Sequence, residues 1–551
     1  MRFQLDHDWQ GNMSTPRARV GESVKTQLLL LLCAIWITLG LIGHAPWKPI
    51  ESTGIIVVKN ILDGGNLMTP LADQSIVLET PPLYYLSAAV SAKLLSPFLG
   101  MHDGARLINI IWLSIVLLMT GMTGRELWAR GVGRHATLIM IGTIGLVTIA
   151  HSISTEVAGL ASIATGFYAL ALSKRRPWRA SALLGLALGF GFLSDGIMPL
   201  LIMLSTALIL PLLFNAWRTQ SFVMVLAVAI LIASPLIAGW IVLLHYHSPV
   251  WLSNWWHLNL VSFKQPNHLY FVRILIWYAW PALPLALWGL WRYRQQLLNK
   301  PKFQLMITFF VVSLFFLSLA ADRKDIYALP LLLPLVALGA GSVEHLKRGA
   351  AAALNWFGVI LFGLIGGLIW LGWIAMMTGY PAKIKERMQF LSGLNDLPLY
   401  WLAFIIAILI TAIWGLVCLR AKQTNKSAVT NWAVGMTFGW GLLMTLWLPL
   451  IDSAKSYQSV FTHLNSVLPK QYTCINSLNA GQAQRLLFEY YTNIKLQPFE
   501  ISQQLNCDLY LIQDDKGTGK MQPGSEWTLI WSGKRPADRK ESFRLFQLVK
   551  N

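Results

Sequence analysis

The sequence predicts an α-helical polytopic membrane protein with a small α/β domain at its C-terminal end. Of its 551 residues, 55% are hydrophobic and only 13% are charged. A soluble globule of this size needs more polar side chains to cover its surface, so the composition is typical of an integral membrane protein. The 25 Trp residues fit this class, because indole rings favour the boundary between lipid headgroups and acyl chains.

The apolar runs define the predicted membrane domain, residues 27–451. Crossing the hydrocarbon core takes about 20 apolar residues, and about thirteen runs of suitable length are predicted. They begin near Gln27, Leu107, His135, Thr155, Ala180, Met198, Ser221, Tyr270, Phe303, Ile326, Leu354, Pro398 and Asn431. The length and number of the runs exclude the buried helices of a large soluble protein. The first run lacks a small-residue cleavage site, so we expect a retained helix rather than a signal peptide.

The charges predict the orientation and exclude one class of partner. Lys and Arg are more frequent in the alternate connections that lie on the side of residues 1–26, as in Lys174–Arg176. The positive-inside rule then places residues 1–26 in the cytoplasm and the C-terminal domain in the periplasm of a bacterial inner membrane. The net charge of +19 is scattered between apolar runs, so no nucleic-acid partner is expected. The long connections, 46–106 and 246–269, face the periplasm.

Residues 452–551 have the pattern of a soluble α/β domain. We expect helices at 457–468 and 483–494, and strands at 471–478, 507–515, 526–533 and 543–549. Cys474 and Cys507 fall in two of these strands. They could form a disulfide in an oxidising periplasm or remain separate buried thiols. Cys33 and Cys418 lie in membrane runs, where packing explains them.

Ionisable residues gather at the predicted periplasmic ends of the spans. The cluster comprises Glu51, Glu79, His102, Asp103, Arg106, His151, Glu156, Asp195, Asp322, Arg323, Lys324 and Asp325, with Ser194 among them. Any one of these residues could simply be a solvated helix end. Polar groups at membrane depth are costly unless they are paired or face water, so a cluster drawn from several connections indicates a functional cavity.

The chemistry that suits this cluster is transfer of a group from a lipid-linked phosphate to an acceptor. Cations and hydroxyls stabilise a departing phosphate, and a carboxylate can take the proton of the acceptor. Arg323 and Lys324, with Tyr327 three residues later, are the best candidates for the phosphate site. With this many carboxylates a divalent cation could bind, but no metal-ligand motif requires one.

Four segments resemble the bacterial membrane glycosyltransferases of the GT-C type, the family of the lipid A aminoarabinose transferase and of relatives of protein O-mannosyltransferases. The segments are PWKPIES at 46–52, LETPPLYYL at 78–86, HDGARL at 102–107 and RKDIYALPLLLPL at 323–335. The resemblance implies an inverting transferase with a polyprenyl-phosphate-linked sugar donor and a lipid or glycan acceptor such as lipid A.

Individual residues take roles from this resemblance. Glu51 matches an acid near the chemistry, and we expect it to be the base for an acceptor hydroxyl. Glu156 and Glu79 match acids that position the acceptor or bind metal. The other expected substrate contacts are Tyr84, Tyr85, His102, Arg106, Lys264, Arg323, Lys324 and Tyr327, with Lys264 standing where relatives often carry arginine.

Three positions depart from the family pattern. Ile50 replaces an acid, Thr80 replaces a lysine, and Asp195 stands where relatives often have lysine. Two of these changes remove cations that would neutralise a phosphate. They therefore favour a second hypothesis, in which the protein is a catalytically inactive relative that binds a lipid or a partner protein. A lipid transporter is the third reading, but it would need charges deep in several spans, and the predicted spans are apolar.

Overall fold

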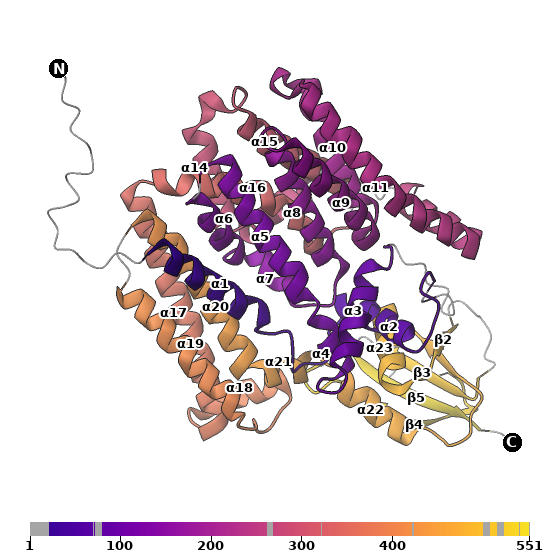
Figure 1. The fold of residues 1–551 in the computed structure, drawn as a ribbon. Coiled ribbons are helices and arrows are strands. Elements are labelled where there is room, and N and C mark those ends of the chain that lie inside the picture. Colours follow the sequence, from indigo (N-terminus) through magenta and orange to yellow (C-terminus); the bar gives the residue numbers. More distant parts are fainter. Residues whose placement is uncertain are drawn as a thin grey trace, which may run out of the picture.

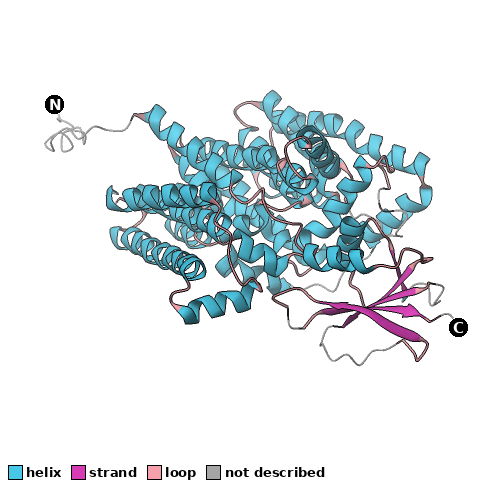
Figure 2. Cartoon of the chain, turned by 90° about the horizontal axis from the view of Figure 1, so that it is seen from below, coloured by secondary structure: helices cyan, strands magenta, loops and turns pink. Residues whose placement is uncertain are grey.

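The computed structural model describes residues 21–69, 71, 80–129, 131–261, 268–320, 322–420, 424–499, 507–514, 523–538 and 540–549. Helices fill most of the molecule, and a small sheet lies at one end (Figure 2). The sheet and its helices adjoin the short helices that follow the first span (Figure 1).

The helices of the membrane domain agree with the apolar runs. Their bounds are α1 Glu22–Thr38, α2 Ile50–Leu62, α3 Leu83–Leu95, α4 Met101–Arg106, α5 Asn109–Leu127, α6 Val132–Ile141, α7 Ile144–Ala150, α8 Thr155–Leu172, α9 Pro177–Asp195, α10 Ile197–Leu213, η3 Asn215–Trp217, α11 Gln220–His247, α12 Pro249–Trp256, η4 His257–Val261, α13 His268–Tyr278, α14 Ala282–Arg292, η5 Arg294–Gln296, α15 Pro301–Ala320, η6 Asp325–Ala328, α16 Leu329–Ser342, η7 Val343–His345, α17 Arg348–Thr378, α18 Ala382–Ser392, α19 Trp401–Arg420, α20 Asn425–Leu446 and α21 Leu448–Lys455.

The protein is a multi-pass helical membrane protein. Within the described ranges, seven helices are long and apolar enough to cross a membrane, or up to ten if each bent pair counts as one span. Each of the predicted runs coincides with helical structure, but the figure of about thirteen spans stays a prediction. The runs that begin near Ala180 and Met198 form a tight hairpin, since α9 and α10 are separated by Gly196 alone, whose φ of 73° favours glycine.

Three of the predicted runs are bent, and two of the bends shape the region of the candidate site. The axes of α6 and α7 differ by 62°, and those of α13 and α14 by 104°. The middle of the bundle is formed by α8 and by α16 with its flanking turns. The most apolar 18-residue stretch is 83% buried in Thr155–Leu172 and 94% buried in Asp325–His345. Small residues let these helices approach closely. At Gly341 of α16, for example, a Cβ atom would come within 2.0 Å of the Trp128 ring.

The C-terminal domain is the predicted α/β unit with one additional strand. Its elements are α22 Gln458–Val467, β1 Ile475–Leu478, α23 Gln482–Thr492, β2 Leu496–Pro498, β3 Leu509–Asp514, β4 Trp527–Gly533 and β5 Ser542–Leu548. The sheet order is β2-β1-β3-β5-β4, with β1 parallel to β2 and β3, and β5 antiparallel to β3 and β4. Strand β2 was not predicted because it is short and ends in proline, which is tolerated there because β2 is an edge strand.

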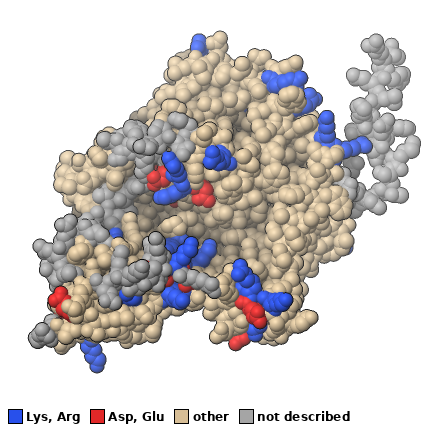
Figure 3. All heavy atoms as spheres, turned by 180° about the vertical axis from the view of Figure 1, so that it is seen from behind, with Lys and Arg blue, Asp and Glu red and all other residues tan. Residues whose placement is uncertain are grey.

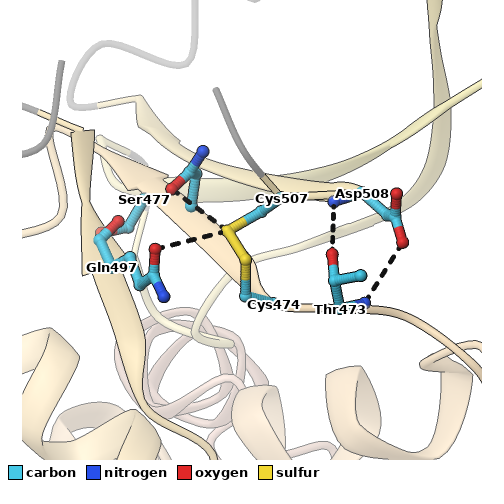
Figure 4. Close-up of a disulfide and its surroundings, with 7 residues drawn as sticks. Thr473, Cys474, Ser477, Gln497, Cys507 and Asp508 are labelled. Atoms are coloured by element: carbon cyan, nitrogen blue, oxygen red, sulfur yellow. Dashed lines mark hydrogen bonds between the residues drawn. A yellow bond between two sulfur atoms is a disulfide. The ribbon is translucent and has the colours of Figure 1, made fainter. Parts of the chain in front are cut away.

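A disulfide joins Cys474 to Cys507, which decides between the two alternatives left open by the sequence (Figure 4). The bond connects the residue before β1 to the segment that leads into β3. Next to it, the Thr473 amide donates a hydrogen bond to Asp508 Oδ2, and the Asp508 amide donates one to Thr473 Oγ1. Disulfides persist in oxidising compartments, so this bond agrees with a periplasmic location of the domain.

We expect loss of this disulfide to destabilise the domain. It joins residues 33 positions apart, so the Cys474→Ser, Cys507→Ser variant should lose about 3 kcal/mol of unfolding free energy as its unfolded chain gains freedom. Hydrogen exchange of strands β1 and β3, measured in increasing denaturant, would follow the change in this domain. The Cys33→Ser, Cys418→Ser variant is the control, because both residues are free thiols. An unchanged stability of the double variant would show that the bond is dispensable.

Candidate active site

Arg106, at the end of α4, is the buried centre of the polar cluster. Its side chain is 0% exposed, and all five of its N–H donors are engaged. Nε donates to Glu51 Oε1 at 2.6 Å, and Nη2 donates to Glu51 Oε2 at 3.1 Å and to the Ala45 carbonyl at 3.0 Å. Nη1 donates to the His44 carbonyl at 2.8 Å and to Asp103 Oδ1 at 2.9 Å. No donor remains for a ligand, so we assign Arg106 a positioning role in place of the predicted substrate contact.

Glu51, in the first turn of α2, is equally occupied. Besides the two-point pair with Arg106, Oε2 accepts from the Trp47 amide at 2.9 Å and Oε1 accepts from the Ile153 amide at 3.0 Å. A carboxylate has about four lone-pair positions, and here each has a donor. Burial by itself would raise the pKa of Glu51, but the adjacent Arg106 guanidinium outweighs it and the pKa is lowered. Glu51 would have to give up one of these bonds before it could accept a substrate proton.

Tyr84, in α3, holds the same loop from its other side. Its hydroxyl donates to Asn109 Oδ1 at 3.0 Å and accepts from the Ser154 amide at 3.0 Å. Asn109 Nδ2 in turn donates to the carbonyls of Ala150 and Ser152. With the bond from Ile153 to Glu51, these contacts fix residues 150–154, which connect α7 to α8. Tyr84 is buried, so its predicted role as a substrate contact also becomes one of positioning.

Glu156, two residues beyond this fixed loop, has a different environment. It lies in the first turn of α8, where the helix dipole favours a negative charge. Among the described residues, its hydrogen-bond partners are the hydroxyls of Ser154 and Thr155, both donating to Oε2. The side chain is partly exposed. A half-buried carboxylate held only by hydroxyl groups can exchange one of them for a substrate hydroxyl.

Asp195 approaches the same face of α8. A Cβ atom at Gly159 would lie 2.4 Å from Asp195 Oδ2, so this carboxylate packs directly on the glycine, one turn beyond Glu156. The replacement of a family lysine by Asp195 therefore adds negative charge close to Glu156. Ile50 begins α2, beside Glu51.

The predicted phosphate segment, Asp322–Tyr327, forms a second group of charges. Arg323 and Lys324 are exposed, Lys324 Nζ lies 3.4 Å from Asp322 Oδ2, and the same nitrogen lies 5.8 Å from the centre of the Tyr327 ring. The segment continues into η6, which packs against α7 and α13. Because α7 leads into the fixed loop, the fold brings this segment towards the start of α8.

Tyr278 of α13 is buried, and its ring packs on Gly145 of α7. Charged side chains border a hollow in one face of the molecule, while most of the surrounding surface is uncharged (Figure 3). The 150–154 loop therefore connects Glu51, which binds the Ile153 amide, to Glu156, which follows the loop. Helix α7 precedes this loop and packs against η6, the element that follows Arg323 and Lys324.

The other predicted residues have varied outcomes. His102 Nδ1 lies 3.0 Å from the Tyr490 hydroxyl, so His102 contacts the C-terminal domain. Tyr85 is buried and packs edge-on against Tyr84. Glu79 and Lys264 lie outside the described residues. Among the residues that are described, no group of three or more His, Cys, Asp or Glu side chains could hold a metal ion.

Comparison with known proteins finds similar sequences among membrane glycosyltransferases. No family model matches the chain. It is 23% identical over 437 residues to the undecaprenyl phosphate-alpha-4-amino-4-deoxy-L-arabinose arabinosyl transferase of Photorhabdus laumondii, covering 75% of each chain. It is 24% identical over 484 residues to a transferase of the same name from Pseudomonas fluorescens, covering 83% of this chain and 78% of that one. The match to the Pseudomonas paraeruginosa transferase spans 63% of that relative.

Solved structures show the same fold. The crystal structure of ArnT from Cupriavidus metallidurans bound to undecaprenyl phosphate superposes with a TM-score of 0.66 at 13% identity, covering 95% of this chain and 98% of that one. The chain therefore has the fold of the GT-C membrane glycosyltransferases, and its sequence is similar to theirs. The archaeal oligosaccharyltransferase AglB from Archaeoglobus fulgidus has a TM-score of 0.50 at 10% identity, covering 89% of this chain and 69% of that one.

Two groups at this site were not identified from the sequence. Asn109 lies inside an apolar run and gives no signal of its own, although it is fully buried and bridges Tyr84 to the 150–154 loop. Trp47 was quoted only as part of a motif, yet its amide and indole N–H groups both make hydrogen bonds that fix the loop before α2.

Replacing Arg106 with lysine should destabilise the GT-C fold by about 3 kcal/mol, because an ammonium has three donors and cannot form the planar two-point pair. The free energy of unfolding in mixed detergent micelles would measure the loss. Arg125→Lys, at an exposed position of α5, is the matched control and should change stability by no more than about 0.5 kcal/mol. A similar, small effect at both positions would contradict the importance of the buried pair.

The stability that Glu51 provides should depend on pH. Its folded-state pKa is lowered, so its contribution is complete above the unfolded value of about 4.3 and is lost as the pH falls through the folded-state pKa. The difference in unfolding temperature between the wild type and Glu51→Gln should therefore be large at neutral pH and shrink below about pH 4. Thermal unfolding of both proteins across this pH range tests the prediction. A difference in unfolding temperature that does not change with pH would contradict it.

Proposed function

We propose that the protein transfers a sugar from a polyprenyl-phosphate carrier to an acceptor at the periplasmic face of the bacterial inner membrane. Lipid A or another envelope glycan is the proposed acceptor. The observation that carries the proposal is the match to named aminoarabinose transferases over three quarters of the chain, together with a fold shared over 95% of it with an undecaprenyl phosphate complex. The orientation, with the N-terminus cytoplasmic and residues 452–551 periplasmic, is part of the proposal.

The proposed reaction is an inverting displacement at the anomeric carbon. The oxygen of an acceptor hydroxyl forms a bond to this carbon while the bond from the carbon to the phosphate oxygen breaks. The acceptor proton passes to a carboxylate, and polyprenyl phosphate leaves with the bonding electron pair. The two halves of this reaction need different groups, a base on the acceptor side and positive charge or hydroxyls on the phosphate side.

We assign the base to Glu156. Its carboxylate is partly exposed and bound only by hydroxyls, whereas Glu51 is buried and has four donors. In this proposal Glu51 and Arg106 keep the 150–154 loop rigid, so that Glu156 is held in place when the acceptor arrives. Asp195 supports it as a neighbouring negative charge. Binding of a divalent cation is a further proposal, although the described residues include no group of side chains that could hold a metal ion.

We assign the phosphate to Arg323, Lys324 and Tyr327. The two cations are exposed beside η6, and the packing of η6 on α7 brings them towards Glu156. The positive charges would offset the charge that develops on the departing phosphate. Lys264 and Glu79 are further proposed contacts from the long periplasmic connections.

The experiment is a transfer assay with purified protein in nanodiscs, labelled undecaprenyl-phosphate aminoarabinose as donor and lipid A as acceptor. Glu156→Gln should lower kcat by about 100-fold or more, since loss of a general base costs that much. Glu344→Gln is the control, because Glu344 forms an exposed pair with Lys426 beyond the far end of α16. Donor binding without transfer by the wild type would favour the inactive-relative reading, and full activity of Glu156→Gln would remove Glu156 from the mechanism.

A further inference from the structure

The short segment before α2 is held by both domains of the protein. The Trp47 amide donates to Glu51 Oε2 at 2.9 Å, while its indole Nε1 donates to Asp452 Oδ1 at 2.9 Å. Asp452 lies in α21, the helix that leads into the C-terminal domain, and its Oδ1 also accepts from the Ala45 amide at 3.0 Å. Trp47 therefore links the acid at the start of α2 to the connection between the domains.

The next residue, Lys48, reaches into the C-terminal domain itself. Its Nζ donates to Glu541 Oε1 at 3.1 Å and lies 5.0 Å from the centre of the Tyr457 ring. Glu541 precedes β5, so this ion pair joins residues 493 positions apart in the chain. Only three positions separate Lys48 from Glu51. A shift of Lys48 must therefore disturb the start of α2.

Glu541 is built into its domain as a rigid anchor. Its side chain is buried, and Oε1 also accepts from Gln484 Nε2 at 2.8 Å and from Gln513 Nε2 at 3.0 Å. Oε2 accepts from the Tyr457 hydroxyl and from Arg535 Nε at 3.3 Å. The residue that precedes α22, helix α23, strand β3 and the segment before β5 all contribute to these contacts. Lys48 is the one donor among them that comes from the membrane domain.

We propose that Lys48 and Glu541 form an interdomain latch that positions the start of α2 for sugar transfer. The C-terminal domain then acts on the site through Lys48. Glu51 in turn holds Ile153 in the 150–154 loop, which leads into the first turn of α8 and Glu156. Neither latch residue touches the reacting atoms, so both are positioning residues. The role in transfer rests on the proposed function, whereas the ordering of the segment does not.

The test uses the full-length protein in nanodiscs with four variants, Lys48→Met, Lys48→Arg, Glu541→Gln and the Lys48→Met, Glu541→Gln double variant. Lys48→Met and Glu541→Gln should lower kcat by at least about tenfold, with little change in KM for the acceptor, because misplacement of catalytic groups acts mainly on the chemical step. The kcat of the double variant should be no lower than that of the less active single variant, because both changes break the same contact. Lys48→Arg should keep most of the activity. Glu526→Gln, at an exposed position of the same domain, is the matched control.

Hydrogen exchange of residues 44–58 provides a readout that does not depend on activity. Exchange should be faster in Lys48→Met than in the wild type and unchanged in Glu526→Gln. Lys48→Met leaves the four other donors of Glu541 in place, so it tests the latch even if Glu541→Gln fails to fold. Wild-type protein without transfer activity would refute the proposed function alone. Wild-type exchange and kcat in Lys48→Met, or losses that multiply in the double variant, would overturn the latch.

Discussion

The burial of one guanidinium is the constraint on which this end of the molecule depends. An arginine cannot lose its charge, and a buried charge costs several kcal/mol unless every donor has a partner. Arg106 meets this condition with two carboxylates and two backbone carbonyls, drawn from the loop after α1, from α2 and from α4. None of these segments can move alone without leaving a buried donor unsatisfied, so they behave as one rigid unit.

This rigid unit separates two kinds of acid that look alike in the sequence. Glu51 uses both oxygens to complete the unit and to hold the 150–154 loop, while Glu156 follows that loop with a carboxylate bound only by neighbouring hydroxyls. The first arrangement favours stability and the second favours exchange with a ligand. The same division applies to the cations, since Arg106 is enclosed and Arg323 and Lys324 are exposed.

Much of the fold could be predicted because each membrane helix corresponds to a continuous run of apolar residues in the sequence. The apolar runs, the hairpin at Gly196 and six of the seven elements of the C-terminal domain beyond α21 follow from hydrophobic period and turn residues. Strand β2 and the 104° bend after α13 did not follow, because a three-residue edge strand and a bend between apolar helices leave almost no local pattern. The gathering of ionisable groups on one side could be predicted, but Asn109 and the interdomain role of Lys48 could not.

The sequence by itself determined the membrane class, the helical segments, the C-terminal domain and the family resemblance, because hydrophobicity and short motifs are properties of neighbouring residues. Only the tertiary structure decided which charged side chains are paired within the protein and which stay accessible to a ligand. That decision depends on partners such as Arg106 for Glu51 and Glu541 for Lys48, which lie 55 and 493 positions away. Whether a buried charge is satisfied is a matter of distances of about 3 Å, and no local pattern carries that information.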